Sequence, residues 1–251
     1  MLPFALLILA FTLLNLRINR HGTLEDALSR SCTEGVKGFF ILLVFFSHAI
    51  GYIKTSGYAF TPVEVRLVNF VQVSIGQLMV VMFLLYSGYG VHQSIMVKGR
   101  KYIKGLPTQR ILPTLFNFDL AILVFALAAL LLGKSITNRQ FLQSLIGWKN
   151  IGNSNWYIFD ILCLYGLAFI SFVTVKDYRK TTALLFLAVF SLILSFGLSK
   201  LKPHWWYDTV LAFPTGMLLS HFKARLALPL KNVKKKALWF SHPVGMLPSS
   251  L

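Results

Sequence analysis

Apolar stretches separated by short polar connections follow one another along the chain. A run of about 20 predominantly apolar residues is long enough to cross the hydrocarbon layer of a membrane as a helix. The pattern predicts an all-α polytopic transmembrane bundle of about seven spans, near Leu2–Leu16, Gly38–Ile53, Val73–His92, Ile111–Leu132, Trp156–Val175, Thr181–Leu198 and Trp205–His221. No soluble domain fits into the connections between them.

Lysine and arginine are distributed unevenly between alternate connections of these spans. The first, third and fifth connections and the C-terminal tail hold 18 of the 25 basic residues, and the other connections hold seven. Because cytoplasmic loops carry the excess of basic residues, this distribution predicts an N-terminus outside and a cytosolic C-terminus.

The composition supports a membrane protein and argues against other classes. The chain is 56% hydrophobic and has eight acidic residues and a formal charge of +17. Its basic residues are scattered between apolar stretches, which fits an anionic lipid leaflet as partner and no nucleic acid. The two cysteines are too few for a disulfide framework, and the six histidines show no metal-ligand spacing.

His48 lies inside the second predicted span, where an ionisable side chain is costly and marks a candidate functional site. Lys37 precedes it by eleven residues, about three helical turns, so both side chains share one helix face about 16 Å apart. With Lys37 at the membrane edge, His48 falls near the middle of the hydrocarbon layer. The alternative is a polar residue that only hydrogen-bonds to a neighbouring helix.

Two carboxylates are candidates to orient the His48 imidazole. Asp119 is expected about 13 Å from the inner membrane edge, at a depth comparable to that of His48. Asp160 is expected about 7 Å from the outer edge. A carboxylate beside histidine raises its basicity, as acyl-transfer chemistry requires. A structural hydrogen bond between helices is again the alternative.

The third connection is the densest basic run between spans. It contains Arg100, Lys101, Lys104 and Arg110, and it follows the small residues of Ser87-Gly-Tyr-Gly90. The run is explained by a solvated cytosolic loop, but arginine and lysine are also suited to the phosphates of a cytosolic cofactor.

Four segments resemble the acyltransferase-3 family of integral membrane O-acyltransferases. They are Thr33–His48 with its basic residue and distant histidine, Phe83–Gly90 with the basic run to Arg110, Asn155-Trp156-Tyr157, and Trp206–Gly216 with its Phe-Pro-Thr-Gly end. The family usually has arginine where this chain has Lys37, and lysine keeps the charge but not the bidentate fork. The family core usually has about ten spans.

The resemblance implies a division of the chain into three parts. Residues 1–29 would form an additional N-terminal transmembrane helix and basic loop, 30–221 a partial acyltransferase-like core, and 222–251 a basic cytosolic tail. On this reading the chain is C-terminally truncated relative to the family.

The resemblance also implies an activity, which is transfer of an acyl group, typically acetyl, from acyl-CoA to a hydroxyl of a carbohydrate or cell-surface glycan. No cofactor would stay bound, and acyl-CoA would be a donor substrate held by Lys37, Ser87 and the basic run. His48 would act as general base or carry the acyl group, with Asp119 or Asp160 in support. Asn155 and Trp156 would contact the acceptor.

Two other interpretations remain open at this stage. One is a multi-span transporter in which His48, Asp119 and Asp160 relay protons or bind a solute. The other is an inactive, truncated fragment of the family.

Overall fold

The computed structural model describes residues 3, 5–7, 9–10, 28–74, 76–178 and 181–240. Within these ranges the chain is helical and contains no strand, so the prediction of an all-α fold is confirmed. The predicted span Leu2–Leu16 and the domain 1–29 lie largely outside the described residues, as do the residues of the C-terminal tail that follow Phe240.

Five helical segments of the described chain are long and apolar enough to cross a membrane. They are Arg30–Thr55, Pro62–Lys98, Arg100–Leu131, Trp156–Val173 and Thr182–Leu201. Their outer surfaces carry large apolar side chains, such as Phe116 at 70% exposure and Leu131 at 79%. Contiguous exposed apolar surface of this extent is unusual in soluble proteins and fits contact with lipid.

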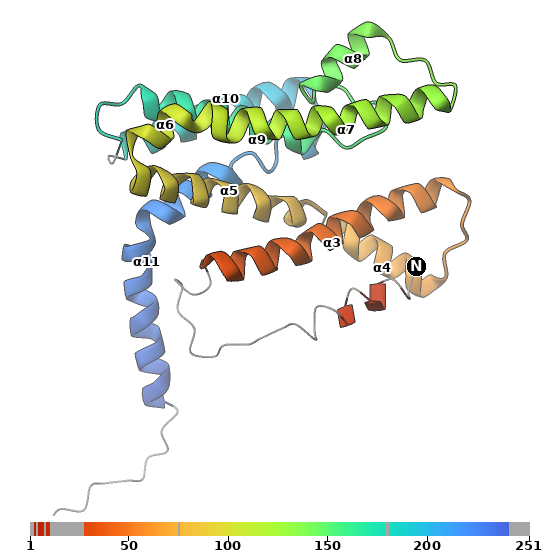
Figure 1. Cartoon of the computed structure of the whole chain (residues 1–251). Coiled ribbons are helices and arrows are strands. Elements are labelled where there is room, and N and C mark those ends of the chain that lie inside the picture. Colours follow the sequence, from red (N-terminus) through yellow and green to blue (C-terminus); the bar gives the residue numbers. More distant parts are fainter. Residues whose placement is uncertain are drawn as a thin grey trace, which may run out of the picture.

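The first two segments form an antiparallel pair. Helix α3 (Arg30–Thr55) begins at the N-cap Ser29, and α4 (Pro62–Asn69) begins with a capping box in which Thr61 and Glu64 exchange hydrogen bonds. A π-helical turn, η1 (Phe70–Ser74), joins α4 to α5 (Gly76–Lys98). The α3 helix packs along α5, and Figure 1 shows both helices on the same side of the molecule as α4.

The remaining helices form the opposite side of the bundle. Gly99, with a φ of 62° that favours glycine, separates α5 from α6 (Arg100–Leu106). A second π-helical turn, η2 (Pro107–Ile111), leads into α7 (Leu112–Leu131), and the short α8 (Asn138–Leu145) follows. Helices α9 (Trp156–Val173) and α10 (Thr182–Leu201) lie beside α6 and α7, with α5 between this layer and α3 (Figure 1).

The last predicted span is wrong at its start. Residues His204–Trp206 form a 3-10 turn, η3, and α11 (Ala212–Phe240) begins seven residues after Trp205. Trp206 is buried against Trp148 and Phe159, with ring centroids 5.9 and 5.6 Å away, so it anchors a turn instead of opening a helix. The α11 helix is also not among the five segments that meet the length and apolarity of a membrane span.

Candidate functional site

Lys37 and His48 lie on one uninterrupted helix, α3, as the sequence predicts. Eleven residues separate them, so the two side chains share a face and lie about 16 Å apart along the axis. Lys37 is half-buried and His48 is exposed. Among the described residues His48 has no hydrogen bond or ion pair, so its imidazole is not committed to a structural contact.

Contacts between α3 and α5 set the depth of these two residues. At one end Tyr86 of α5 lies within electrostatic range of Cys32, and at the other Gln72 donates a hydrogen bond to the Ser47 carbonyl at 3.4 Å. Lys37 is therefore about level with position 81, one or two turns from Ser87. His48 is level with η1, and about 22 Å along the helix axis separates it from Ser87.

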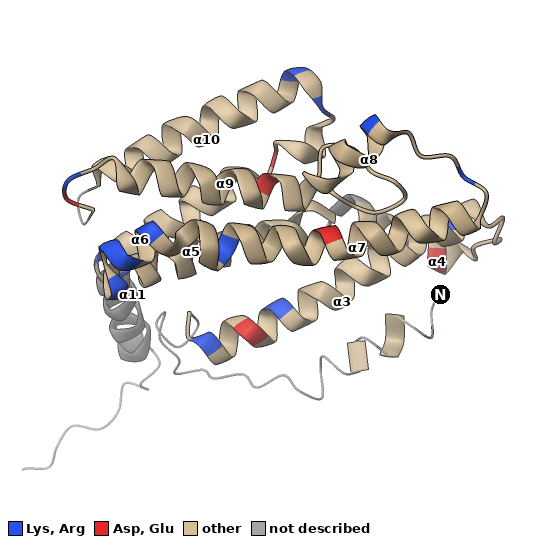
Figure 2. Cartoon of the chain, turned by 45° about the horizontal axis from the view of Figure 1, so that its top comes forward, with Lys and Arg blue, Asp and Glu red and all other residues tan. Residues whose placement is uncertain are grey.

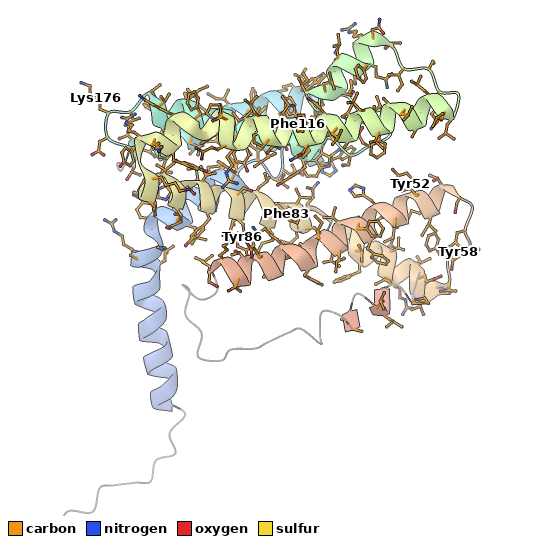
Figure 3. All side chains as sticks on the ribbon, in the orientation of Figure 1. Tyr52, Tyr58, Phe83, Tyr86, Phe116 and Lys176 are labelled. Atoms are coloured by element: carbon orange, nitrogen blue, oxygen red, sulfur yellow. The ribbon has the colours of Figure 1, made fainter. Side chains whose placement is uncertain are left out.

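The C-terminal end of α3 approaches the loop between α8 and α9. The Tyr52 hydroxyl, one turn after His48, donates to the carbonyl of Gly152 at 3.2 Å, and Figure 3 shows Tyr52 near the far end of α3. A methyl group on Gly152 would lie 3.9 Å from a ring carbon of Phe125 on α7. The face of α3 that carries His48 is thus turned toward α7 and this loop.

Asp119 is at a depth similar to that of His48 but does not bond to it. It precedes Phe125 by six residues on α7, which places it about 9 Å inward of the Tyr52–Gly152 contact, whereas His48 is about 6 Å inward. One Asp119 carboxylate oxygen is buried without a hydrogen-bond partner among the described residues. The structure supports equal depth and leaves the predicted His48–Asp119 pair a prediction.

Asp160 lies apart from His48 in the interior of α9. Its side chain is fully buried, and neither carboxylate oxygen has a hydrogen-bond partner in the described part of the chain. A carboxyl group in this setting is costly unless it is neutral or binds a ligand. Asp160 is therefore a candidate site in its own right, and the predicted pairing with His48 finds no contact here.

Ser87 and Arg110 belong to a line of hydroxyl groups between α5, α6 and α9, here called the hydroxyl seam. Arg110 Nε donates to the Tyr102 hydroxyl at 3.1 Å. The positive charge of the Arg110 guanidinium also lies within electrostatic range of the Tyr165 hydroxyl. Ser87 in turn interacts with the hydroxyls of Tyr165 and Tyr157. The seam connects the basic run to the start of α9.

Phe83 joins the hydroxyl seam to the α3 side of the bundle. Its ring centroid is 6.4 Å from that of Tyr157, and it lies with Tyr86 between α5 and α3 in Figure 3. Among the predicted cofactor residues, Ser87 and Arg110 are thus linked through tyrosine hydroxyls, and Lys37 lies one or two turns of α5 away from the level of Ser87.

Arg100 has a structural role that the sequence did not suggest. Its guanidinium donates to the carbonyls of Phe172 and Val173 at 3.4 and 3.2 Å, and also to those of Val175 and Lys176, at the end of α9. Lys101 and Lys104 are more exposed, on α6. Figure 2 shows several blue Lys and Arg positions of the ribbon gathered where α5 gives way to α6.

The two predicted acceptor residues lie where the loop between α8 and α9 meets the start of α9. The Asn155 side chain is buried and donates to the Gly147 carbonyl at 2.6 Å, while Trp156 is half-buried with its ring 6.4 Å from that of Tyr157. Beside them Lys202 lies over the rings of Trp148 and Trp206, at 3.7 and 4.0 Å. Burial there, and secondarily the charge of Lys149, lowers the pKa of Lys202 below its usual range.

Sequence reasoning missed the polar contact between α5 and α11. His92 is 2% exposed, and its Nδ1 lies 2.7 Å from the Ser220 hydroxyl, to which Gln93 also donates at 2.9 Å. The His92 and His221 rings meet at 5.5 Å. Histidine near the end of an apolar span was the available signal, but its partner lies 128 residues away.

Two glycines of the family-like segments form the crossing of the same two helices. A methyl group on Gly88 would lie 2.0 Å from the Phe213 carbonyl oxygen, and one on Gly216 would lie 2.0 Å from that of Leu85. Small residues allow this close approach of backbones in membranes. The segments Ser87-Gly-Tyr and Phe213-Pro-Thr-Gly216 are therefore in contact, and their glycines allow α5 and α11 to pack closely.

Comparison of the chain with protein-family models, with curated proteins and with solved structures finds no match.

Proposed function

We propose that this chain is an integral membrane acyltransferase similar to the acyltransferase-3 family. It would move an acyl group, typically acetyl, from acyl-CoA to a hydroxyl of a carbohydrate or cell-surface glycan. The proposed location is a bacterial cytoplasmic membrane with the N-terminus outside and the C-terminus in the cytosol. The observation that carries the proposal is the common face of α3, with Lys37 about 16 Å from an uncommitted His48.

The donor enters from the end of the bundle that carries the basic run. Its phosphates are held by Lys37 and by the cations around α6, among which Arg110 offers a planar guanidinium fork. Lys37 would contact the pyrophosphate from which the pantetheine arm extends toward His48. The Lys37–His48 separation is of the order of an extended pantetheine arm, so the thioester reaches the imidazole.

The chemical step needs one base and one leaving group. His48 removes the proton of the acceptor hydroxyl as its oxygen attacks the thioester carbonyl. The new oxygen–carbon bond forms, the carbon–sulfur bond breaks, and the thiolate of coenzyme A takes up a proton as it leaves. Asp119, at equal depth on α7, is the proposed carboxylate that supports the charged imidazolium, and the acceptor approaches from the loop of Asn155 and Trp156.

A second candidate function is transport, and Asp160 is the observation that favours it. A fully buried carboxyl with two unpartnered oxygens inside a membrane bundle is typical of groups that bind protons or cations. Transport requires no acyl donor, so donor binding discriminates between the two functions.

Binding of acetyl-CoA to the purified protein, measured by titration calorimetry in detergent, tests the proposal. We expect saturable binding that weakens about tenfold in Lys37→Ala, because a charge-assisted contact contributes about 1.5–3 kcal/mol. Lys134→Ala, which removes an exposed cation from the connection after α7, serves as the matched control and should bind as the parent does. No binding by a folded parent, together with proton uptake that Asp160→Asn abolishes, would favour transport.

A further inference from the structure

An apolar groove lies on the α3–α4 side of the molecule, away from the hydroxyl seam and from the His48 face. Its volume is about 400 Å³, within the range of about 300–1,000 Å³ that small-molecule sites occupy. The N-terminal segment, α3, α4, η1 and α5 all contribute to its walls, through residues that include Leu6, Phe40, Leu43, Leu67, Phe70 and Val71. In Figure 1 the short N-terminal helical pieces run beside α3 and α4.

The groove is continuous with the surface that faces lipid. Its own wall includes Phe70 at 57% exposure and Leu78 at 49%, and the neighbouring α3 positions Ile41 and Leu42 are 58% and 42% exposed. All of these residues belong to segments apolar enough to span a membrane. Hydrocarbon is thus the medium that meets the open side of the groove.

A cation lies next to one end of the groove. Arg66 of α4 is exposed, and in the described part of the chain its side chain has no hydrogen bond or ion pair. It precedes Phe70 by four residues, so it projects from the same helix face about 6 Å beyond this wall residue. An arginine in that position suits a phosphate oxygen at the membrane surface.

The wall of the groove also includes a backbone irregularity. Phe70 and Val71 belong to the π-helical turn η1, and π-turns inside α-helices are frequently found at functional sites. A π-turn contains more residues than an α-helical turn, so η1 changes the direction of the α4 side chains relative to those of α5. Residues of both helices therefore contribute to one wall of the groove.

We propose that this groove binds one phospholipid, with an acyl chain between α3 and η1 and the phosphate at Arg66. The inference is independent of the proposed acyl transfer, because the groove is on the opposite side of α3 from His48. Among membrane components, an anionic phospholipid satisfies both the apolar wall and the unpaired guanidinium.

Lipid retention by the full-length protein tests the site. The protein is purified in detergent, delipidated, incubated with micelles containing phosphatidylglycerol or phosphatidylcholine, washed, and examined by native mass spectrometry. We expect the parent to keep one phosphatidylglycerol per chain. Leu43→Trp, which fills the groove, should keep none, and Arg66→Gln should lose the preference for phosphatidylglycerol over phosphatidylcholine.

Leu127→Trp is the matched control, since it adds the same side chain to an exposed, lipid-facing position of α7. It should retain lipid as the parent does. Equal retention by the parent and Leu43→Trp would overturn the proposal, as would a parent that retains no lipid. A parent that is dimeric and becomes monomeric in Leu43→Trp would assign the groove to a second copy of the chain instead. Because Arg66 is exposed, the Arg66→Gln protein should fold. The contribution of the charge can therefore be tested even if the Leu43→Trp protein does not fold.

Discussion

At the residue scale, position within an apolar span identified His48 but said nothing about its surroundings. His48 proves to be exposed and to have no hydrogen bond to the described residues, whereas His92, near the end of the next span, is buried and bonded to Ser220. His92 is buried because α5 packs against α11. Its partner Ser220 is 128 positions away, so the local spacing of residues gives no sign of this contact. Sequence could therefore nominate ionisable residues in the membrane but could not sort catalytic from structural ones.

The contact of Ser220 with His92 and Gln93 makes a testable contribution to stability. Because Gln93 donates to the Ser220 oxygen, the Ser220 proton is free to be donated to a neutral His92 at Nδ1. Ser220→Ala leaves both partners unsatisfied and should lower the free energy of unfolding in detergent by about 1–3 kcal/mol. Thr215→Ala on the same helix removes only a local bond to Leu211 and should cost less, so equal losses would contradict this assignment.

At the element scale, hydropathy located the long helices well and their interruptions poorly. The predicted spans Gly38–Ile53, Val73–His92 and Thr181–Leu198 fall largely within α3, α5 and α10. The structure adds the short helices α4 and α8 and the π-turns at Phe70–Ser74 and Pro107–Ile111. These depend on caps and on packing against neighbours, to which an average over apolar residues is insensitive.

The crossing of α5 and α11 offers a matched pair of glycine substitutions. Gly88→Ala places a methyl group 2.0 Å from the Phe213 carbonyl oxygen, so the backbones must separate. We expect a loss of at least about 1–3 kcal/mol, or failure to fold, because overpacking is destabilising. Gly90→Ala, with open space around the added methyl group, should be neutral or stabilising by about 0.5–1 kcal/mol. Thermal unfolding in detergent compares the two, and similar melting temperatures would contradict the close crossing.

At the scale of the whole molecule, the all-α membrane bundle was predictable and the offset of its helices was not. Apolar length reports that a helix can span a membrane, but it does not report how far one helix slides along the next. The hydrogen bond from Gln72 to the Ser47 carbonyl, with Tyr86 within electrostatic range of Cys32, defines that offset for α3 and α5. As a result Lys37 lies near the level of Ser87, while His48 lies far from it and close in depth to Asp119.

The same arrangement gives the proposed enzyme two separated regions. The basic run and Arg110 lie at one end of the bundle, and the hydroxyl seam leads from them to the start of α9 beside Asn155. His48 and Asp119 lie farther from the basic run, toward the opposite end of α3. Such a layout suits a donor that enters from one side of a membrane and an acceptor that enters from the opposite side.

Acyl transfer itself is the most direct measurement of the central claim. Purified protein in lipid vesicles is given acetyl-CoA carrying a labelled acetyl group and a glycan acceptor, and the label on the glycan is followed with time. A general base contributes about 10²–10⁴-fold, so His48→Ala should reduce transfer by at least about a hundredfold. His204→Ala, which removes an exposed histidine whose ring is paired with Asp208 and not with His48 or Asp119, should transfer as the parent does. Transfer by His48→Ala at the parental rate would contradict the account.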